Sequence, residues 1–97
     1  MRIEIKKFGD VLVSRQAGRE AFAAFLPTLK NIKKGEVILI DFSGVVVLSP
    51  SWADEFLTPM FDRFGNSLKL IPSRNSSVKL TIQTIEEIIK KDFQISD

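Results

Sequence analysis

The spacing of apolar residues predicts two short strands at the start of the chain. Over residues 2–7, Ile3 and Ile5 alternate with polar or charged residues, which is the period of a half-buried strand. The turn residues Gly9 and Asp10 separate this segment from a second apolar run at residues 11–13. We therefore expect the chain to open with a β-hairpin.

Three later segments show the spacing of helices. The first is predicted after Ser14, from apolar positions 22, 25, 26 and 29, with a kink or a fresh turn at Pro27. The second is predicted over about residues 51–64, because serines flank Pro50 and proline is favoured in a first helical turn. The third is predicted after a cap at Ser76 or Ser77, with positions 78, 82, 85 and 89 on one face.

A continuous apolar run at residues 37–40 predicts the central strand of a sheet, covered on both faces. A further strand is predicted at residues 68–71, before Pro72. The expected order is strand, strand, helix, strand, helix, strand, helix. This order predicts an α/β fold in which helices pack on a mixed sheet of about four strands. A chain of 97 residues has room for one domain, so residues 1–97 are expected to form a single unit.

The composition narrows the classes of function. The chain contains no cysteine and no histidine, which removes the thiol nucleophile, the common general base and most transition-metal ligands. We therefore expect no catalysis, no cofactor and no metal site. The lack of cysteine is compatible with a reducing compartment, and no apolar run is long enough for a membrane span. A cytoplasmic protein without membrane contact is expected.

The charge balance does not favour nucleic-acid binding. Fourteen basic and twelve acidic residues leave a net charge of +2. The lysine pairs at 6–7, 33–34 and 90–91 are scattered along the chain, whereas nucleic-acid readers gather their basic residues on one face. Solvated surface is the preferred interpretation, and salt-dependent binding to DNA or RNA is kept as an alternative.

The segment from Val37 to Glu55 resembles the most characteristic region of STAS domains, the anti-sigma-factor antagonist family. It contains Asp41-Phe42 at the end of a strand, then a serine-rich turn at residues 49–51 and the helix start Ala53-Asp54-Glu55. The strand at residues 68–71 and the helix from Val78 are similar to the closing elements of that family. The closest resemblance is to divergent STAS-like families of uncharacterised function. It implies a STAS-like fold and a bacterial-type signalling regulator that docks onto another protein.

The resemblance also implies a modification site. In the antagonists, a loop reading Asp-Ser-Ser-Gly begins the second helix, and its second serine accepts a phosphate from a partner kinase. Ser51 matches this serine by position, while Ser49, Pro50 and Trp52 occupy the other three positions. The implied partner is an ATP-binding serine kinase of the histidine-kinase-like ATPase type. The alternative is that Ser51 only caps the second helix, in a capping box with Asp54.

Several neighbours of Ser51 are candidates for partner binding. On a helical projection Trp52 lies at one edge of the apolar arc, which predicts either the rim of the core or an anchor for a partner. The acids near the helix start either bind a partner or interact with the helix dipole. The candidate partner-binding residues are Ser49, Trp52, Asp54, Glu55 and Arg63. The sequence therefore predicts a protein-interaction module switched by phosphorylation, with constitutive binding or homodimerisation as alternatives.

Overall fold

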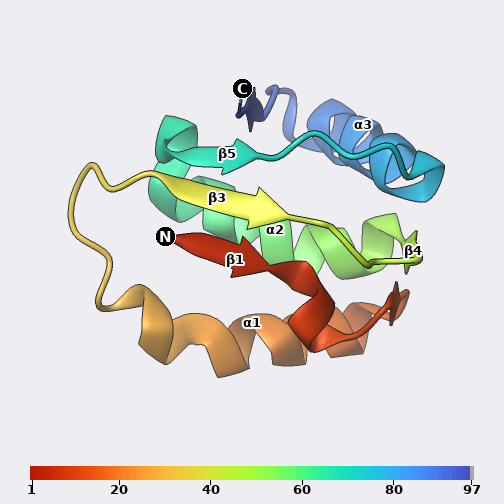
Figure 1. Ribbon diagram of the computed structural model, residues 1–97, viewed down its shortest axis with the longest axis horizontal. Coiled ribbons are helices and arrows are strands. Elements are labelled where there is room, and N and C mark those ends of the chain that lie inside the picture. The colour runs from red at the N-terminus through yellow and green to blue at the C-terminus, as the bar shows by residue number, and fades with distance from the viewer. Residues whose placement is uncertain (97) are drawn as a thin grey trace.

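The computed structural model describes residues 1–96 and shows one parallel sheet with helices behind it (Figure 1). The sheet has the strand order β1-β3-β5-β6, and every strand pairing in the described residues is parallel. Its strands are β1 (Arg2–Glu4), β3 (Ile38–Asp41), β5 (Leu68–Leu70) and β6 (Gln94–Ile95). The expected α/β class and the central place of β3 are confirmed, but the sheet reaches four strands with β6 in place of the expected strand at residues 11–13.

Three α-helices form the second layer. They are α1 (Arg15–Leu29), α2 (Pro50–Phe64) and α3 (Ser76–Ile89), with short 3₁₀ helices η1 (Ile5–Phe8) and η2 (Gly65–Ser67). Figure 1 shows α2 behind the sheet, with α1 and α3 at its two sides. Ile3, Ile40 and Leu70 are neighbours in register across three strands and are buried against this layer. The core therefore lies between α2 and one face of the sheet.

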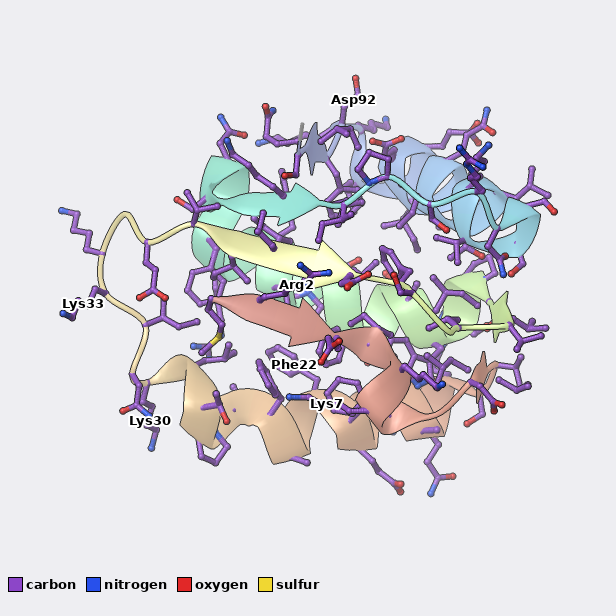
Figure 2. All side chains as sticks on the ribbon, in the orientation of Figure 1. Arg2, Lys7, Phe22, Lys30, Lys33 and Asp92 are labelled. Atoms are coloured by element: carbon purple, nitrogen blue, oxygen red, sulfur yellow. The ribbon has the colours of Figure 1, made fainter. Side chains whose placement is uncertain are left out.

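The opposite face of the sheet is open, so the expectation that β3 is covered on both faces is wrong. Leu39 is only half-buried, and its neighbours in register are Arg2 and Lys69. Figure 2 shows Arg2 in front of the sheet, and in Figure 1 no helix lies in front of β1, β3 and β5. Charged side chains on the two neighbouring strands can flank Leu39 because all the helices pack against the other face.

The expected opening hairpin is wrong, and the mixed pairing that it implied is wrong with it. Strand β2 (Val11–Leu12) does not pair with β1 but runs parallel to β4 (Val47–Leu48) in a separate two-stranded sheet. Between β1 and β2 the chain forms η1, in which Ile5 is fully buried. Pairing β1 with the central strand places Ile3 and Ile5 in the core together, and burial of this apolar surface outweighs a local turn.

The helix starts are partly as expected. Ser14 caps α1, since the backbone N–H of Ala17 donates to its Oγ at 2.9 Å, and α1 continues two residues past Pro27 without a fresh turn. The cap of α3 is Asn75 rather than Ser76 or Ser77, with the N–H of Val78 donating to Asn75 Oδ1 at 3.1 Å.

Asn75 was not recognised as a cap from the sequence because adjacent serines have the same capping chemistry. Tertiary contacts decide between them: Asn75 Nδ2 also donates to the carbonyl of Val46 at 2.9 Å, and the N–H of Leu48 donates to Ser77 Oγ at 3.2 Å. These side chains tie the start of α3 to β4.

Candidate functional site

Ser49 joins the start of α2 to the end of β2. Its Oγ accepts from the backbone N–H of Trp52 at 3.3 Å, which makes Ser49 the N-cap of α2. The same Oγ donates to the carbonyl of Val13 at 2.8 Å. The Ser49 hydroxyl therefore holds the start of α2 to the segment that follows β2. A serine cap directly before a proline at the first helical position is a favoured helix start.

Ser51 lies in the first turn of α2 and is free of the capping role. The interpretation of Ser51 as the cap is wrong, because Ser49 holds that position. The side chain of Ser51 is partly exposed, and the side-chain hydrogen bonds found within residues 1–96 at the start of α2 involve the hydroxyl of Ser49 and not that of Ser51. A hydroxyl that is accessible and uncommitted is what a modification at this position requires.

Trp52 belongs to the core, which excludes it as a partner-facing anchor in this conformation. Its side chain is 1% exposed and stacks on Phe56, with ring centroids 5.1 Å apart. Phe8 packs against both rings. The helical projection placed Trp52 at an edge of the apolar arc, but α1 and η1 cover that edge in the folded chain.

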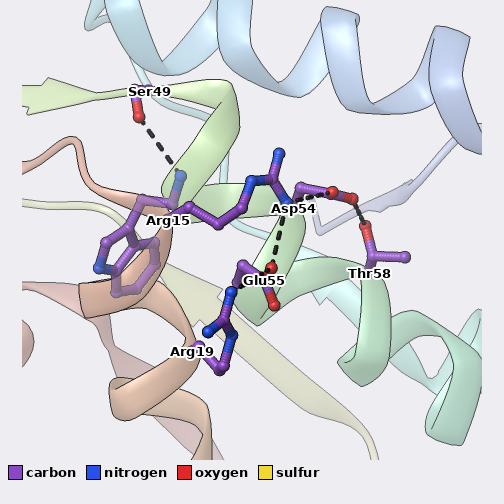
Figure 3. A network of polar contacts seen from close by, with 7 residues as sticks. Arg15, Arg19, Ser49, Asp54, Glu55 and Thr58 are labelled. Atoms are coloured by element: carbon purple, nitrogen blue, oxygen red, sulfur yellow. Dashed lines mark hydrogen bonds and ion pairs between the residues drawn. The ribbon is translucent and has the colours of Figure 1, made fainter.

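The acidic candidates of α2 are paired with α1 (Figure 3). Arg15 Nη1 donates to Asp54 Oδ2 at 2.9 Å and to Glu55 Oε1 at 3.1 Å, and Arg19 Nη2 lies 3.6 Å from the same Glu55 oxygen. The Arg15 guanidinium, and to a lesser extent the hydroxyl of Thr58, lower the pKa of the Asp54 carboxyl. The expected capping box with Asp54 is absent because this carboxylate binds side chains rather than the first turn.

Arg63 is not brought together with the other candidates. It lies in the last turn of α2, twelve residues after Ser51, which corresponds to roughly 18 Å along a helix axis. There it lines a hollow with Lys33, and Figure 2 shows Lys33 at the end of the molecule opposite to β4. A basic side chain at a helix C-terminus stabilises the helix dipole, and this accounts for Arg63.

The structure adds an exposed apolar surface that the sequence analysis did not identify. We call it the β2–β4 tip. Val11 and Val47 face each other in register, and Val13 is linked through its carbonyl to the cap of α2. The tip consists of Val11, Val13, Val46 and Val47, whose side chains are between 37% and 58% exposed. Clusters of exposed apolar residues of this kind mark interaction surfaces.

This surface could have been found only by knowing which strands pair. Residues 11–13 and 45–48 each form a short apolar run, but valines in such runs are usually buried in a sheet. The pairing of two very short strands leaves Leu12 and Leu48 in the core and turns the valines outward.

Three helices packed on a parallel four-stranded sheet are consistent with a STAS-like α/β fold. The family model described as "STAS-like domain of unknown function (DUF4325)" matches residues 25–90, from within α1 to the end of α3. The chain therefore belongs to this family, and the resemblance seen in the sequence is confirmed. The comparisons with curated proteins and with solved structures found no match.

Over residues 1–96, no helix combines the length and the hydropathy that crossing a bilayer demands. In the same residues, no three aspartate or glutamate side chains gather closely enough to hold a metal ion.

Proposed function

We propose that this chain is a protein-interaction module, without catalysis of its own, that docks onto a protein partner through the β2–β4 tip. The observation that carries the proposal is that the exposed valines of the tip are joined through Val13 to Ser49, the cap of α2, two residues before the partly exposed Ser51. The acidic side chains nearest to this site support a non-catalytic role, because Asp54 and Glu55 are held in ion pairs by Arg15.

The proposed partner buries the valines of the tip, and Ser51 lies at the border of that contact. Phosphorylation of Ser51 by an ATP-binding serine kinase is the proposed switch. A phosphoserine adds a charge of about −1.5 to −2 at neutral pH. Asp54 and Glu55, three and four residues further on, are paired with Arg15 and Arg19, so the switch does not depend on repulsion by these acids. Burying the added charge next to an apolar contact costs free energy, and the phosphorylated form releases the partner.

The switch is tested with a purified ATP-binding serine kinase of the histidine-kinase-like ATPase type. Incubation with ATP is expected to add one phosphate, located at Ser51 by mass spectrometry. Ser51→Ala is expected to remain unmodified, and the exposed Ser76 provides a matched control as Ser76→Ala. Modification of Ser51→Ala at the same rate as the natural chain contradicts the assignment.

The docking surface is tested separately from the switch, with the same kinase as the binding partner. Val47→Asp places a charge in the tip and is expected to weaken binding at least tenfold, because an unpaired charge would be buried in an apolar contact. Leu80→Asp makes the same change at an exposed site of α3 and is expected to bind normally.

Two results would select an alternative. Equal affinities of the phosphorylated and unmodified chains indicate a constitutive binding module. A Val47→Asp chain that loses self-association in analytical ultracentrifugation, rather than binding of the kinase, identifies a homodimer.

A further inference from the structure

A pocket of about 340 Å³ lies beside α3, at the end of the sheet remote from the loop between α1 and β3. Its floor is made by Phe42, Leu70 and Val78, each no more than 3% exposed. Pockets for small ligands have volumes of roughly 300–1,000 Å³ and are lined mainly by apolar side chains with a few polar groups. This pocket has the size and the lining of such a site.

The pocket exists because the sheet extends one strand beyond the cover of α3. Ile95 pairs in register with Leu70, and its side chain therefore points to the helix side of the sheet. Leu70 is buried there, whereas Ile95 remains 54% exposed. Ile82 on α3 faces the same space and is half-buried. Ile82 and Ile95 therefore form an apolar strip that the core of residues 1–96 leaves uncovered.

The charges on the rim differ between the two ends of the pocket. Lys79 lies in the first turns of α3, near the positive end of the helix dipole. Glu86 lines the pocket two turns later, about 10 Å further along the helix axis. The backbone N–H of Phe93 donates to Glu86 at 2.8 Å and holds this carboxylate at the far end. A ligand with one anionic end is accepted in a single orientation.

We propose that this pocket binds a free, linear aliphatic carboxylate of medium chain length. The carboxylate pairs with Lys79, and the alkyl chain lies along Ile82 and Ile95. Glu86 repels the reverse orientation by charge, and the alkyl chain and the exposed side chain of Ile95 are favoured by losing contact with water. The site is separate from the β2–β4 tip and does not depend on the proposed docking function.

The test is a titration of the natural chain with decanoate, kept below its micelle concentration and followed by amide NMR. Saturable shifts are expected at Lys79, Ile82, Gln83 and Ile95. Decanol, which has the same chain without the charge, is the matched ligand. Lys79→Gln is expected to weaken decanoate binding about threefold, the scale of one exposed ion pair, and to leave decanol binding unchanged.

Two further variants separate the pocket from the rest of the chain. Ile82→Glu is expected to abolish binding of both ligands, whereas Leu80→Glu, an equal change at an exposed position on the same helix, is expected to bind normally. Ser51→Ala is expected to bind decanoate like the natural chain. A failure of the phosphorylation switch therefore does not contradict ligand binding in the pocket, and a failure of ligand binding does not contradict the switch.

Several outcomes overturn the proposal. Shifts that do not saturate, or that persist in Ile82→Glu, show non-specific association. An equal loss of affinity for decanoate and for decanol in Lys79→Gln shows that Lys79 does not recognise the carboxylate. Shifts at Ile95 that change with protein concentration, without ligand, assign the strip to a second copy of the chain. Saturable binding of an apolar extended peptide without binding of decanoate assigns it to a peptide.

Discussion

Asp41 shows how one buried side chain organises the turn after the central strand. Its Oδ1 accepts from the backbone N–H of Ser43 at 2.9 Å and from the Ser43 hydroxyl at 2.7 Å, and its Oδ2 accepts from the Arg2 guanidinium. The turn closes with the N–H of Val45 donating to Phe42 O at 3.0 Å, and Gly44 adopts a φ of +84° that favours glycine. Asp41 thus has a structural role, although it lies in the segment that resembles STAS domains.

The carboxylate of Asp41 makes the stability of the chain depend on acid pH. The hydrogen bonds from Ser43, followed by Arg2, lower the pKa of Asp41 from 3.8 to about 2. Because the folded-state pKa is lower than that of the unfolded chain, Asp41 stabilises the fold fully above pH 3.8. This contribution is lost as the pH falls towards 2.

Asp41→Asn is expected to lower the free energy of unfolding at pH 7 by about 2 kcal/mol, the scale of a lost charge-assisted hydrogen bond to a buried group. In urea unfolding, the difference between Asp41→Asn and the natural chain is expected to shrink between pH 4 and pH 2. Glu4→Gln, at an exposed position of β1, is the control and should show no such convergence. A difference that stays constant over this range would mean that Asp41 acts by packing and not by charge.

At the scale of elements, the contact between α1 and α2 sets the shape of the candidate site. Phe22 and Phe25 of α1 pack on Phe56 with ring centroids 6.0 and 6.2 Å away, and the arginines of α1 hold the acids of α2. Gly18 allows the close approach: a Cβ there would lie 2.5 Å from the carbonyl oxygen of Trp52. Because Trp52 follows Ser51 directly, the same contact positions the first turn of α2.

Gly18→Ala is expected to destabilise the chain, although alanine favours a helix over glycine by about 1 kcal/mol. The added methyl group meets backbone that cannot move aside, and overpacking of this kind costs about 1–3 kcal/mol. Thermal unfolding followed by circular dichroism measures the effect. Gln16→Ala, at an exposed position of α1, is the control and should change stability little. A more stable Gly18→Ala chain would show that α1 and α2 can move apart without a cost in free energy.

At the scale of the whole molecule, the fold includes segments on both sides of the family match. Strand β1 lies before residues 25–90 and β6 after them, and these strands form the two edges of the four-stranded sheet. Phe93, just before β6, is 4% exposed and packs edge to face on Phe61, with ring centroids 5.4 Å apart. The N–H of Ser96 donates to Leu70 O at 2.8 Å. The segment after α3 is therefore part of the core.

Phe93→Ala is expected to lower the free energy of unfolding by about 3–5 kcal/mol, the usual cost of removing a buried aromatic ring. Denaturant unfolding measures this loss, and hydrogen exchange at the amide of Ser96 should become faster as β6 separates from β5. Gln94→Ala, at an exposed neighbouring position, is the control. A Phe93→Ala chain with unchanged stability would mean that the sheet is complete without β6.

The sequence predicted the features that depend on neighbouring residues. The three helices, the Ser14 cap and the central strand are all visible in local spacing and in side-chain chemistry. It did not predict β6, because Gln94 and Ile95 are too short a run to show a strand period. It left Trp52 open between the rim of the core and an anchor for a partner, because a helical projection shows which edge a residue occupies and not which other helix covers that edge.

The sequence by itself therefore determined the three helices, the places of β1, β2, β3 and β5 relative to them, and the membership of a STAS-like family. Tertiary structure alone decided that β1 joins β3, that β2 joins β4, and that Trp52 is buried while Ser51 stays accessible. The physical reason is the range of the interactions. Periodicity and capping act within a few residues, whereas strand pairing and exposure are set by apolar surfaces that meet across most of the chain.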